Sequence, residues 1–597
     1  MSPARRAALP LLFCLFVAHL TAIASAAAAE PALRRSDVVF MYDDPKQYEA
    51  YGCTALGWAG SGDPKRVEAA HAKGVRLFCS SVGFLTEWSG MIDYSPEDFL
   101  DAACRNFEGK PFVVPWLWDH KHKGQPAWWW CTNSPLYRKY LESRIARMMK
   151  APLDGLHIDD YRGTSGAVTW LSAGFCRHCT AGFREYLQRN VPKEKLAALG
   201  ITDLAKFDYR QFLLDRGVTP ERYRKERARL PLAAEFLDFQ VKANNAFVAE
   251  YRKRAEELRG QPLALCVNSN ITDPHALMIA PQLTFFGCEV GHDAAARKVP
   301  LGPVYAYKLA DGVGRPVAST ASGQDWADVA ENNLPGLVRT WIALSYAMGH
   351  HFMAPHRQWC YTEKKGTHWY SGPAEEYAYM YQFVRQNARL LDRYEAMAPV
   401  AVVYDNAARR RGQADVRPIC VALADKNIPF TVAAAGDDWL DYRLDAQKLA
   451  GFKAVILAGE FAGDEAQRKA IDQVRAAGRL MRWPDARRLG ELVPSPIVVE
   501  GSSDVLAVPR AIPGDAAAPV VVHLLNRRYD GQKDTMIPQE NFTVRLRNDL
   551  LAGRKCTRAV LHAPKTQAQT LEVRTDKEHT MVRVPGLVLW GIIELRD

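Results

Sequence analysis

Short apolar runs alternate with helical segments over most of this chain, and this alternation constrains the fold more than any other feature. The runs are DVVFMYDD (37–44), VRLFCSSVG (75–83), PFVVPWLWDH (111–120), GLHIDDYRG (155–163), PLALCVNSN (262–270), LTFFGCEVG (283–291), RPVASTASG (315–323) and AMGHHFMAP (347–355). Stretches with helical spacing, such as 134–150 and 233–258, lie between most of them. Repeated strand–helix units imply parallel strands, and eight of them predict an α/β fold of the (β/α)8 TIM-barrel type. The alternative is an open doubly wound sheet, but no glycine-rich phosphate loop follows the first run to support it.

The pattern changes twice after the predicted barrel. A chain of 597 residues is expected to form about two to four domains. We predict a barrel over 36–396 with a long insertion at about 164–259, which is either a lid or a peripheral embellishment. A shorter strand–helix series predicts a flavodoxin-like α/β domain over 397–492. Alternating β patterns with frequent turns predict a C-terminal antiparallel β-sandwich over 495–597.

The first residues have the composition of an export signal. Arg5 and Arg6 precede an apolar run from Ala7 to about Ile23, and small residues follow at 24–29. A basic segment, an apolar segment and an Ala-x-Ala type cleavage region predict a signal peptide over 1–29, and hence a periplasmic or secreted protein. A membrane anchor is the alternative, although the run is short for a spanning helix. No later stretch is apolar enough to span a membrane, so none is expected after signal removal.

Charge and cysteine content exclude some functions and leave others open. The net charge is +10, but the one dense basic cluster, 409–411, is short, and no nucleic-acid-binding motif accompanies it, so no nucleic-acid partner is expected. Of twelve cysteines, Cys14 lies in the predicted signal, which leaves an odd number. Cys176 and Cys179 could form a local disulfide or half of a metal site, but no second CxxC supplies two more zinc ligands. We therefore predict structural cysteines, no metal and no cofactor.

Polar residues stand at the C-terminal ends of most of the predicted strands. They are Asp43 and Asp44 after the first run, Asp119 and His120 after the third, Asp159 and Asp160 after the fourth, Asn268 and Asn270 after the fifth, Glu289 after the sixth, and His350 and His351 after the eighth. A barrel builds its active site at these ends. So many polar side chains at one rim predict a pocket for a ligand with many hydroxyl groups.

The predicted order of domains resembles that of family 42 glycoside hydrolases and their uncharacterised barrel relatives. HLLNRRYD (523–530) resembles the C-terminal β-domain of several glycosidase families, and DGLHIDDYRG followed by FCRHCTAGFREYL resembles hypothetical glycosyl hydrolases of that wider group. Family 42 has an Asn-Glu pair after strand four, whereas this chain has Asp159-Asp160. The pattern Asp-Gly-x-x-x-Asp is instead similar to α-amylase, family 31 and family 66 enzymes. That resemblance implies Asp159 as the nucleophile and, by position, Glu289 as the second carboxyl group.

Strand alternation supports the choice of Asp159 over Asp160. Alternate residues of a strand point the same way, so His157 and Asp159 are expected inside the barrel and Leu156 and Ile158 against the helices. Glycoside hydrolysis needs one ionised and one protonated carboxyl group. A structural carboxylate at Asp159, or an ion-pair partner at Glu289, is the alternative. Asp325, after the seventh run, is a rival for the second role.

Other residues of the rim are predicted to contact the sugar. Aromatic rings pack on the C–H faces of sugars, while hydroxyl groups need polar partners. At least two of the tryptophans at 128–130 are expected in the core, and no tight metal-ligand spacing involves the histidines. The predicted substrate-binding residues are Asp44, Trp116, Trp118, Asp119, His120, His157, Asp160, Asn268, His292 and His351.

Together these features predict an exported glycoside hydrolase that cleaves a glycosidic bond in an oligo- or polysaccharide. A retaining mechanism with an Asp nucleophile and a Glu acid/base is favoured. Two alternatives stay open: an inverting glycosidase or other carbohydrate-active enzyme, and a non-catalytic carbohydrate-binding protein on a barrel scaffold. The flavodoxin-like domain suggests a homo-oligomer only by analogy.

Overall fold

The computed structural model describes residues 31–60, 62–85, 87–551 and 553–597. The predicted signal peptide at 1–29 lies outside the described residues. Within them, no helix combines the length and the apolar character that crossing a membrane requires.

Two parallel sheets form the centre of the molecule. In spatial order the first contains β1 (Val39–Phe40), β2 (Ala55–Ala59), β3 (Leu77–Gly83), β6 (Gly155–Asp159) and β7 (Ala264–Val267), and the second contains β8 (Phe286–Glu289), β9 (Val317–Thr320) and β10 (His351–Phe352). The sheets meet at both edges. The backbone N–H of Thr284 donates to Leu265 O at 2.8 Å beside β7, and that of Ala354 donates to Val39 O at 2.8 Å beside β1. The eight strands therefore follow one another in a ring, with the eighth beside the first.

One of the predicted strands is wrong, and one strand was missed. The run 111–120 does not join the ring: Pro115–Leu117 is a 3-10 helix, η2, and Val113 makes an isolated antiparallel bridge to Trp128. One proline begins this run and another, Pro115, interrupts it, and proline cannot donate a ladder hydrogen bond. The second strand is instead β2, whose sequence ALGWA has no polar end that would mark it. The two errors cancel in the count, so β6 is still the fourth strand and β8 the sixth.

Strand β6 shows the predicted alternation. Only glycine fits at position 155, because a Cβ atom there would lie 2.6 Å from Cys79 Sγ and 2.7 Å from Ala264 O. His157 stacks inside the ring on Trp58, with ring centroids 4.1 Å apart. Leu156 and Ile158 belong instead to the large outer core beneath the helices. The inner core contains Val39, Met41, Ala55, Trp58, Leu77, Cys79, Ala264, Cys266, Phe285, Ala318 and Met353.

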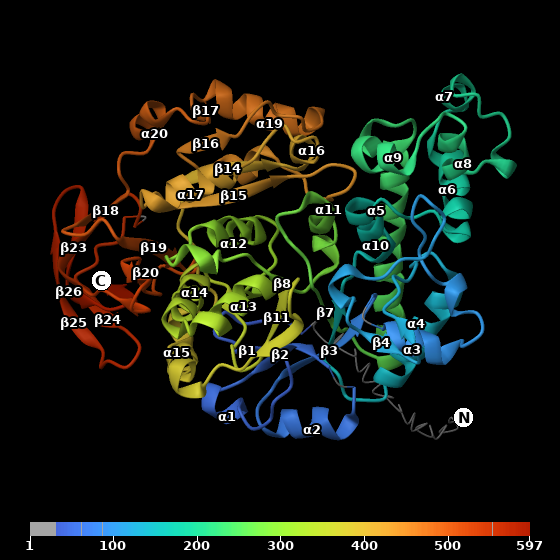
Figure 1. The fold of residues 1–597 in the computed structure, drawn as a ribbon. Coiled ribbons are helices and arrows are strands. Elements are labelled where there is room, and N and C mark those ends of the chain that lie inside the picture. The colour runs from blue at the N-terminus through green and yellow to red at the C-terminus, as the bar shows by residue number, and fades with distance from the viewer. Residues whose placement is uncertain (1–30, 61, 86, 552) are drawn as a thin grey trace, which may run out of the picture.

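Helices surround this ring, and the insertion after β6 has its own aromatic core. The flanking helices include α2 (Pro64–Ala72), α4 (Pro135–Met148), α10 (Ala233–Arg259), α12 (Gly302–Gly312), α13 (Gly323–Asn332), α14 (Pro335–Ala347) and α15 (Ala374–Gln386). The insertion contains α5 (Gly163–Leu171), α6 (Arg177–Asn190), α7 (Lys193–Ala198), α8 (Tyr209–Leu214) and α9 (Pro220–Glu226), and α6 to α9 lie at the upper right of Figure 1. A hairpin of β11 (Gln358–Thr362) and β12 (Gly366–Tyr370) follows β10.

Two further sheets complete the chain. A four-stranded parallel sheet has the order β15 (Phe430–Ala435), β14 (Val400–Asp405), β16 (Ala454–Leu457) and β17 (Leu480–Arg482), with α17 (Arg417–Asp425) and α19 (Glu465–Ala476) among its helices. An antiparallel sheet then combines β13 (Glu395–Ala396) with β18 (Ile497–Glu500), β19 (Val505–Ala511), β20 (Val520–Asn526), β23 (Gln539–Arg547), β24 (Arg558–His562), β25 (Gln569–Thr575), β26 (His579–Leu587) and β27 (Trp590–Arg596). It is the red unit at the left of Figure 1.

Candidate active site

Asp159, Asn268 and Glu289 occupy one level at the C-terminal ends of neighbouring strands. The level below them fixes this arrangement: His157 on β6 pairs in register with Cys266 on β7, and a Cβ atom on Gly287 of β8 would lie 3.3 Å from His157 Nδ1. These three residues therefore form an inward-facing layer. Asp159, Asn268 and Glu289 each lie two residues further along their strands, so they form the next layer, at the rim. The alternation that the sequence left ambiguous for strand six thus places Glu289 inward.

Asp159 ends β6, and the residue is partly exposed. Its Oδ1 accepts hydrogen bonds from the backbone N–H of Asp160 at 2.9 Å and from Asn268 Nδ2 at 3.1 Å. Burial raises the pKa of Asp159 to about 6, and the two hydrogen bonds oppose that rise because they stabilise the ionised form. Asp159 is therefore held in place and is ionised at neutral pH.

Glu289 ends β8 and is also partly exposed. Burial raises its pKa to about 8, the negative charges of Asp159 and Asp325 add to the rise, and a hydrogen bond from Asn268 opposes it. Glu289 is therefore protonated at neutral pH while Asp159 is ionised. Two coupled carboxyl groups whose pKa values are pushed apart can divide the roles of base or nucleophile and acid.

Asp160 follows β6 in a left-handed backbone conformation, with φ of 48°. This region is uncommon for residues other than glycine, and such strain gathers at functional sites. Burial raises the pKa of Asp160 well above its usual range, and the charges of Asp159 and Glu289 raise it further. A third carboxyl group thus lies in the electrostatic field of the other two, and it is driven toward the protonated form.

Tyr42, Arg357 and Trp369 extend this cluster, and sequence reasoning missed all three. Burial raises the pKa of Tyr42, and the charges of Asp159 and then Glu289 raise it further, which places the tyrosine near both. The Tyr42 ring meets Trp369 edge to face at 5.4 Å, and the Arg357 guanidinium lies 4.2 Å from the Trp369 ring centroid. Tyr42 precedes the first run's two aspartates and could have been found by position. Arg357 and Trp369 depend on the hairpin after β10, which no apolar pattern marked.

The predicted residues after η2 form part of the rim beside this hairpin. Asp119 Oδ1 lies 2.9 Å from His120 Nδ1, and a Cβ atom on Gly366 of β12 would meet Asp119 Oδ2 at 2.6 Å. Trp118 is 50% exposed and Trp369 is 44% exposed. Trp116 packs edge to face on Trp129 and Trp170, with centroids 5.6 and 6.0 Å away. Two exposed tryptophans therefore belong to segments that touch each other.

Asp44 lies in the loop after β1. It is partly exposed, its Oδ1 accepts from the backbone N–H of Lys46 at 3.2 Å, and its charge raises the pKa of His356 against the larger lowering effect of burial. Its neighbour Asp43 instead pairs with Arg66 at 2.5 Å. Asp44 thus remains available at the rim, whereas Asp43 is engaged with a helix.

Three histidines that were predicted to bind substrate are buried instead. His157 is one layer below Asp159 and lies 3.3 Å from Cys266 Sγ, and burial lowers its pKa to about 3. His351 begins β10 and lies 2.8 Å from Arg34 O, at the opposite end of the ring from Asp159. His292 packs against Trp341 at 4.8 Å, and burial lowers its pKa to about 4. The structure does not bring these three to the rim, because their rings fill apolar core that the sequence pattern could not distinguish from pocket lining.

Asp325, the rival for the second catalytic role, supports a loop. Its carboxylate accepts from the backbone N–H groups of His292 at 2.9 Å and Ala294 at 2.8 Å, and from Ser322 Oγ at 2.7 Å. The side chain is buried at the N-terminus of α13. With its oxygens engaged by three donors, Asp325 fixes the loop after Glu289 and influences that glutamate through its charge.

Comparisons with known proteins found two curated relatives and solved structures of similar fold. The chain is 25% identical over 501 residues to an α-agarase of Thalassotalea agarivorans, which covers 79% of this chain and 33% of the relative. It is 24% identical over 508 residues to an α-agarase of Alteromonas agarilytica, covering 82% of this chain and 35% of the relative. The chain thus spans about a third of the length of these curated relatives. No protein-family model matches it.

A solved structure supports the fold. α-L-Fucosidase isoenzyme 2 from Paenibacillus thiaminolyticus superposes with a TM-score of 0.59 at 12% sequence identity, covering 94% of this chain and all of the fucosidase. At that identity the likeness concerns the fold alone. The sequence relatives bear the name of a glycoside hydrolase, in agreement with the class predicted from the sequence, whereas the resemblance to families 42, 31 and 66 in particular receives no support from these comparisons.

Proposed function

We propose that this chain is a retaining glycoside hydrolase in which Asp159 is the nucleophile and Glu289 is the acid/base. The observation that carries the proposal is the pair itself: two carboxyl groups at one rim, bridged by Asn268, with pKa values of about 6 and about 8. At pH 7 one is ionised and the other protonated, which is the state that glycoside hydrolysis requires.

The mutual electrostatics suit a two-step reaction. In the first step Asp159 attacks the anomeric carbon, the bond to the leaving oxygen breaks, and Glu289 gives its proton to that oxygen. The new ester has no charge, so the contribution of ionised Asp159 to the raised pKa of Glu289 disappears. Glu289 becomes a better base at the moment when it must take a proton from water. Water then attacks the anomeric carbon and releases Asp159 as a carboxylate.

An inverting reaction is the second candidate, and a specific observation keeps it open. Asp159 is on β6 and Glu289 on β8, and β7 lies between these strands because it pairs with β6 and Thr284, just before β8, donates to Leu265 of β7, so the two backbones are about 10 Å apart. With this backbone spacing, the two carboxyl groups can lie about 5–5.5 Å apart, as retention requires, or about 6.5–9.5 Å apart, as inversion requires. Proton NMR of the first-formed sugar decides between them, because retention gives the substrate's anomer and inversion gives the opposite one.

The same proposal includes the domain organisation and export. We infer that the ring of eight strands is a (β/α)8 barrel over 36–396, that the four-stranded parallel sheet belongs to a flavodoxin-like domain over 397–492, and that the antiparallel sheet belongs to a β-sandwich over 495–597. The strand order and the fucosidase-like fold support this assignment. The sequence of 1–29 supports export. Limited proteolysis that releases fragments ending near 396 and 492 would test the boundaries.

Agar is the first substrate to test, because the two sequence relatives are named for it. The purified chain is incubated with agar and with a panel of other polysaccharides and aryl glycosides, and new reducing ends are measured. Release of reducing ends from at least one of them, lost in Asp159→Asn, supports the proposal. Binding of a polysaccharide without turnover under all conditions would favour a carbohydrate-binding protein instead.

A further inference from the structure

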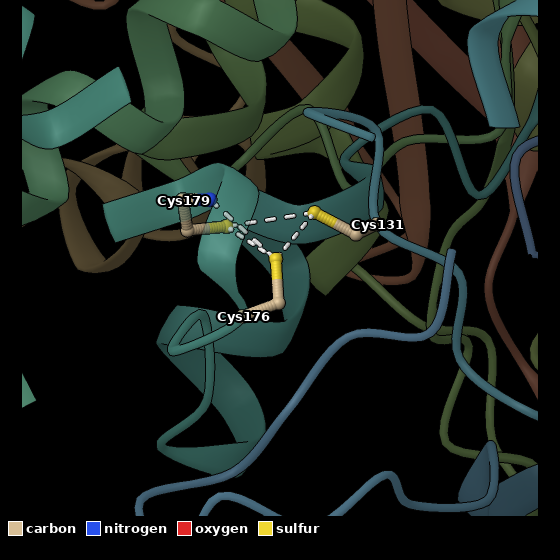
Figure 2. Close-up of side chains that lie close together, drawn as sticks. All are labelled: Cys131, Cys176 and Cys179. Carbon is tan, nitrogen blue, oxygen red and sulfur yellow. Dashed lines mark hydrogen bonds between the residues drawn. The ribbon is translucent and has the colours of Figure 1, made fainter. Parts of the chain in front are cut away.

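Three buried thiols converge in the structure, and a fourth lies next to one of them. The Sγ atoms of Cys131 and Cys176 are 3.3 Å apart, and each lies 3.5 Å from Cys179 Sγ (Figure 2). Cys104 is the fourth. Its thiol hydrogen-bonds that of Cys131 and also feels the charge of Cys176.

Two chain segments hold these thiols in place. Cys104 and Cys131 lie diagonally across an antiparallel bridge between Ala103 and Trp130, in which the Cys104 N–H donates to Trp129 O and the Cys131 N–H donates to Ala102 O, both at 2.8 Å. Cys176 is the N-cap of α6, and Cys179 lies in the first turn of that helix. The cluster is therefore built by backbone structure on both sides.

The spacing of the sulfur atoms fits a shared metal ion. A disulfide brings two sulfur atoms to about 2.05 Å and would use only one pair, whereas here three sulfur atoms are mutually equidistant within 0.2 Å. Four thiolates around a tetrahedral zinc ion, at Zn–S of about 2.3 Å, lie about 3.8 Å from one another. We propose that Cys104, Cys131, Cys176 and Cys179 bind a structural zinc ion.

The surroundings of the sulfur atoms also suit thiolates. Thr164 Oγ1 donates to Cys131 Sγ at 3.4 Å, Asn133 Nδ2 donates to Cys179 Sγ at 3.4 Å, and the Cys179 N–H donates to Cys176 Sγ at 3.5 Å. Donors that surround metal-bound sulfur orient the ligands and tune the site.

Sequence reasoning set a zinc site aside because no second CxxC was available. The structure supplies the two other thiols singly: Cys104 precedes and Cys131 follows the run 111–120, which the sequence pattern misassigned as a strand. A search for paired CxxC motifs does not detect cysteines that a loop brings together singly.

The ion would fasten the loop after β3 to the insertion after β6. Next to Cys131, Thr132 Oγ1 contacts Thr164 Oγ1 and Asn244 Oδ1, both at 3.1 Å, and a Cβ atom on Gly163 would meet Thr132 at 2.4 Å. This contact lies just beyond Asp160. The zinc site is thus a positioning element for the loop that follows the candidate nucleophile.

Metal analysis of the purified full chain tests the proposal. The protein is prepared without chelator, and its zinc content is measured by inductively coupled plasma mass spectrometry. About one zinc ion per chain is expected, and Cys176→Ser and Cys104→Ser should lose most of it. Cys556→Ser is the matched control, because Cys556 is also buried, in the core of the C-terminal unit just before β24, and its substitution should leave the zinc content unchanged.

A second measurement covers variants that fail to fold. In the wild type, a mercurial reagent is added in steps, and zinc release is followed with a chromogenic chelator. Mass spectrometry after alkylation, with and without prior chelation, then identifies the protected cysteines. Protection of these four thiols only while zinc is bound supports the proposal. A wild-type chain without zinc would overturn the proposal, whether the four thiols are free, disulfide-bonded or bound to iron. Both measurements are independent of glycosidase activity.

Discussion

Asn268 Nδ2 donates a hydrogen bond to Asp159 Oδ1 at 3.1 Å, and a hydrogen bond from the same side chain lowers the pKa of Glu289. Asn268 follows β7, the strand between those that carry the two carboxyl groups. One neutral amide therefore connects the proposed nucleophile with the proposed acid/base. It stabilises the ionised form of both groups without adding a charge. It therefore opposes, but does not cancel, the rise that burial causes in the two pKa values.

Activity is expected to depend on pH as a bell-shaped curve with its maximum near neutrality. Retaining catalysis needs Asp159 ionised, which requires a pH above about 6, and Glu289 protonated, which requires a pH below about 8. The measurement is kcat/KM between pH 4 and 10 on any substrate that the chain cleaves. A flat profile across this range would show that these groups do not control the reaction.

Replacing Glu289 should make the fold more stable at high pH. In the folded chain the pKa of Glu289 is about 8, against a usual value of 4.5, so the folded state keeps a proton that the unfolded state gives up between these values. The wild type therefore loses stability as pH rises through this window. Glu289→Gln has no proton to lose, and its free energy of unfolding relative to the wild type should rise with pH and level off above about pH 8. Denaturant unfolding at pH 4, 7 and 9 measures this, and a difference that stays constant with pH would contradict it.

Asp325 and Glu289 should respond differently to substitution. Asp325→Ala leaves the backbone N–H groups of His292 and Ala294 without their acceptor, which is expected to cost about 1–3 kcal/mol of stability. It also removes a charge that raises the pKa of Glu289, so the upper limb of the pH profile should move to lower pH. Glu289→Gln should instead lower kcat by about 10²–10⁴-fold. The reverse result, with the larger loss of kcat in Asp325→Ala and an unshifted profile, would exchange the roles of the two.

The exposed tryptophans of the rim are expected to bind sugar. Trp369→Ala and Trp118→Ala should raise KM about 3- to 10-fold with little change in kcat, because stacking on a sugar face contributes to substrate and transition state alike. Val588→Ala is the control, since Val588 is 62% exposed in the turn between β26 and β27. An unchanged KM in both tryptophan variants would show that the sugar does not extend along this rim.

Much of the central fold follows from local pattern. The alternation within β6 predicts the inward Asp159 and the outward Leu156 and Ile158, because a two-residue period fixes which face each side chain takes. The second strand, ALGWA, was not predicted because it is buried on both faces and has no polar end. Such a run shows no alternation of polar and apolar residues. The run at 111–120 misleads because apolar residues around two prolines pack in a loop as well as in a strand.

The candidate site is harder to predict, because its parts are brought together by tertiary contacts. Asp159, Asn268 and Glu289 could be chosen by position, since each ends a strand. His157, His292 and His351 could not be separated from them, because a buried histidine and a ligand-binding histidine look alike in sequence. Arg357 and Trp369 reach the site on a hairpin, and Cys104 reaches Cys131 across an antiparallel bridge, so neither pairing leaves a local signal.

The activity of Asp159→Asn tests the central proposal most directly. The variant keeps the size of the side chain but removes the charge that attacks the anomeric carbon. We predict a loss of at least about 100-fold in kcat with substrate binding retained, while Asp472→Asn, an exposed aspartate of α19, keeps full activity. Full activity in Asp159→Asn, measured on the substrate that the wild type cleaves, would contradict the assignment of Asp159 as the nucleophile.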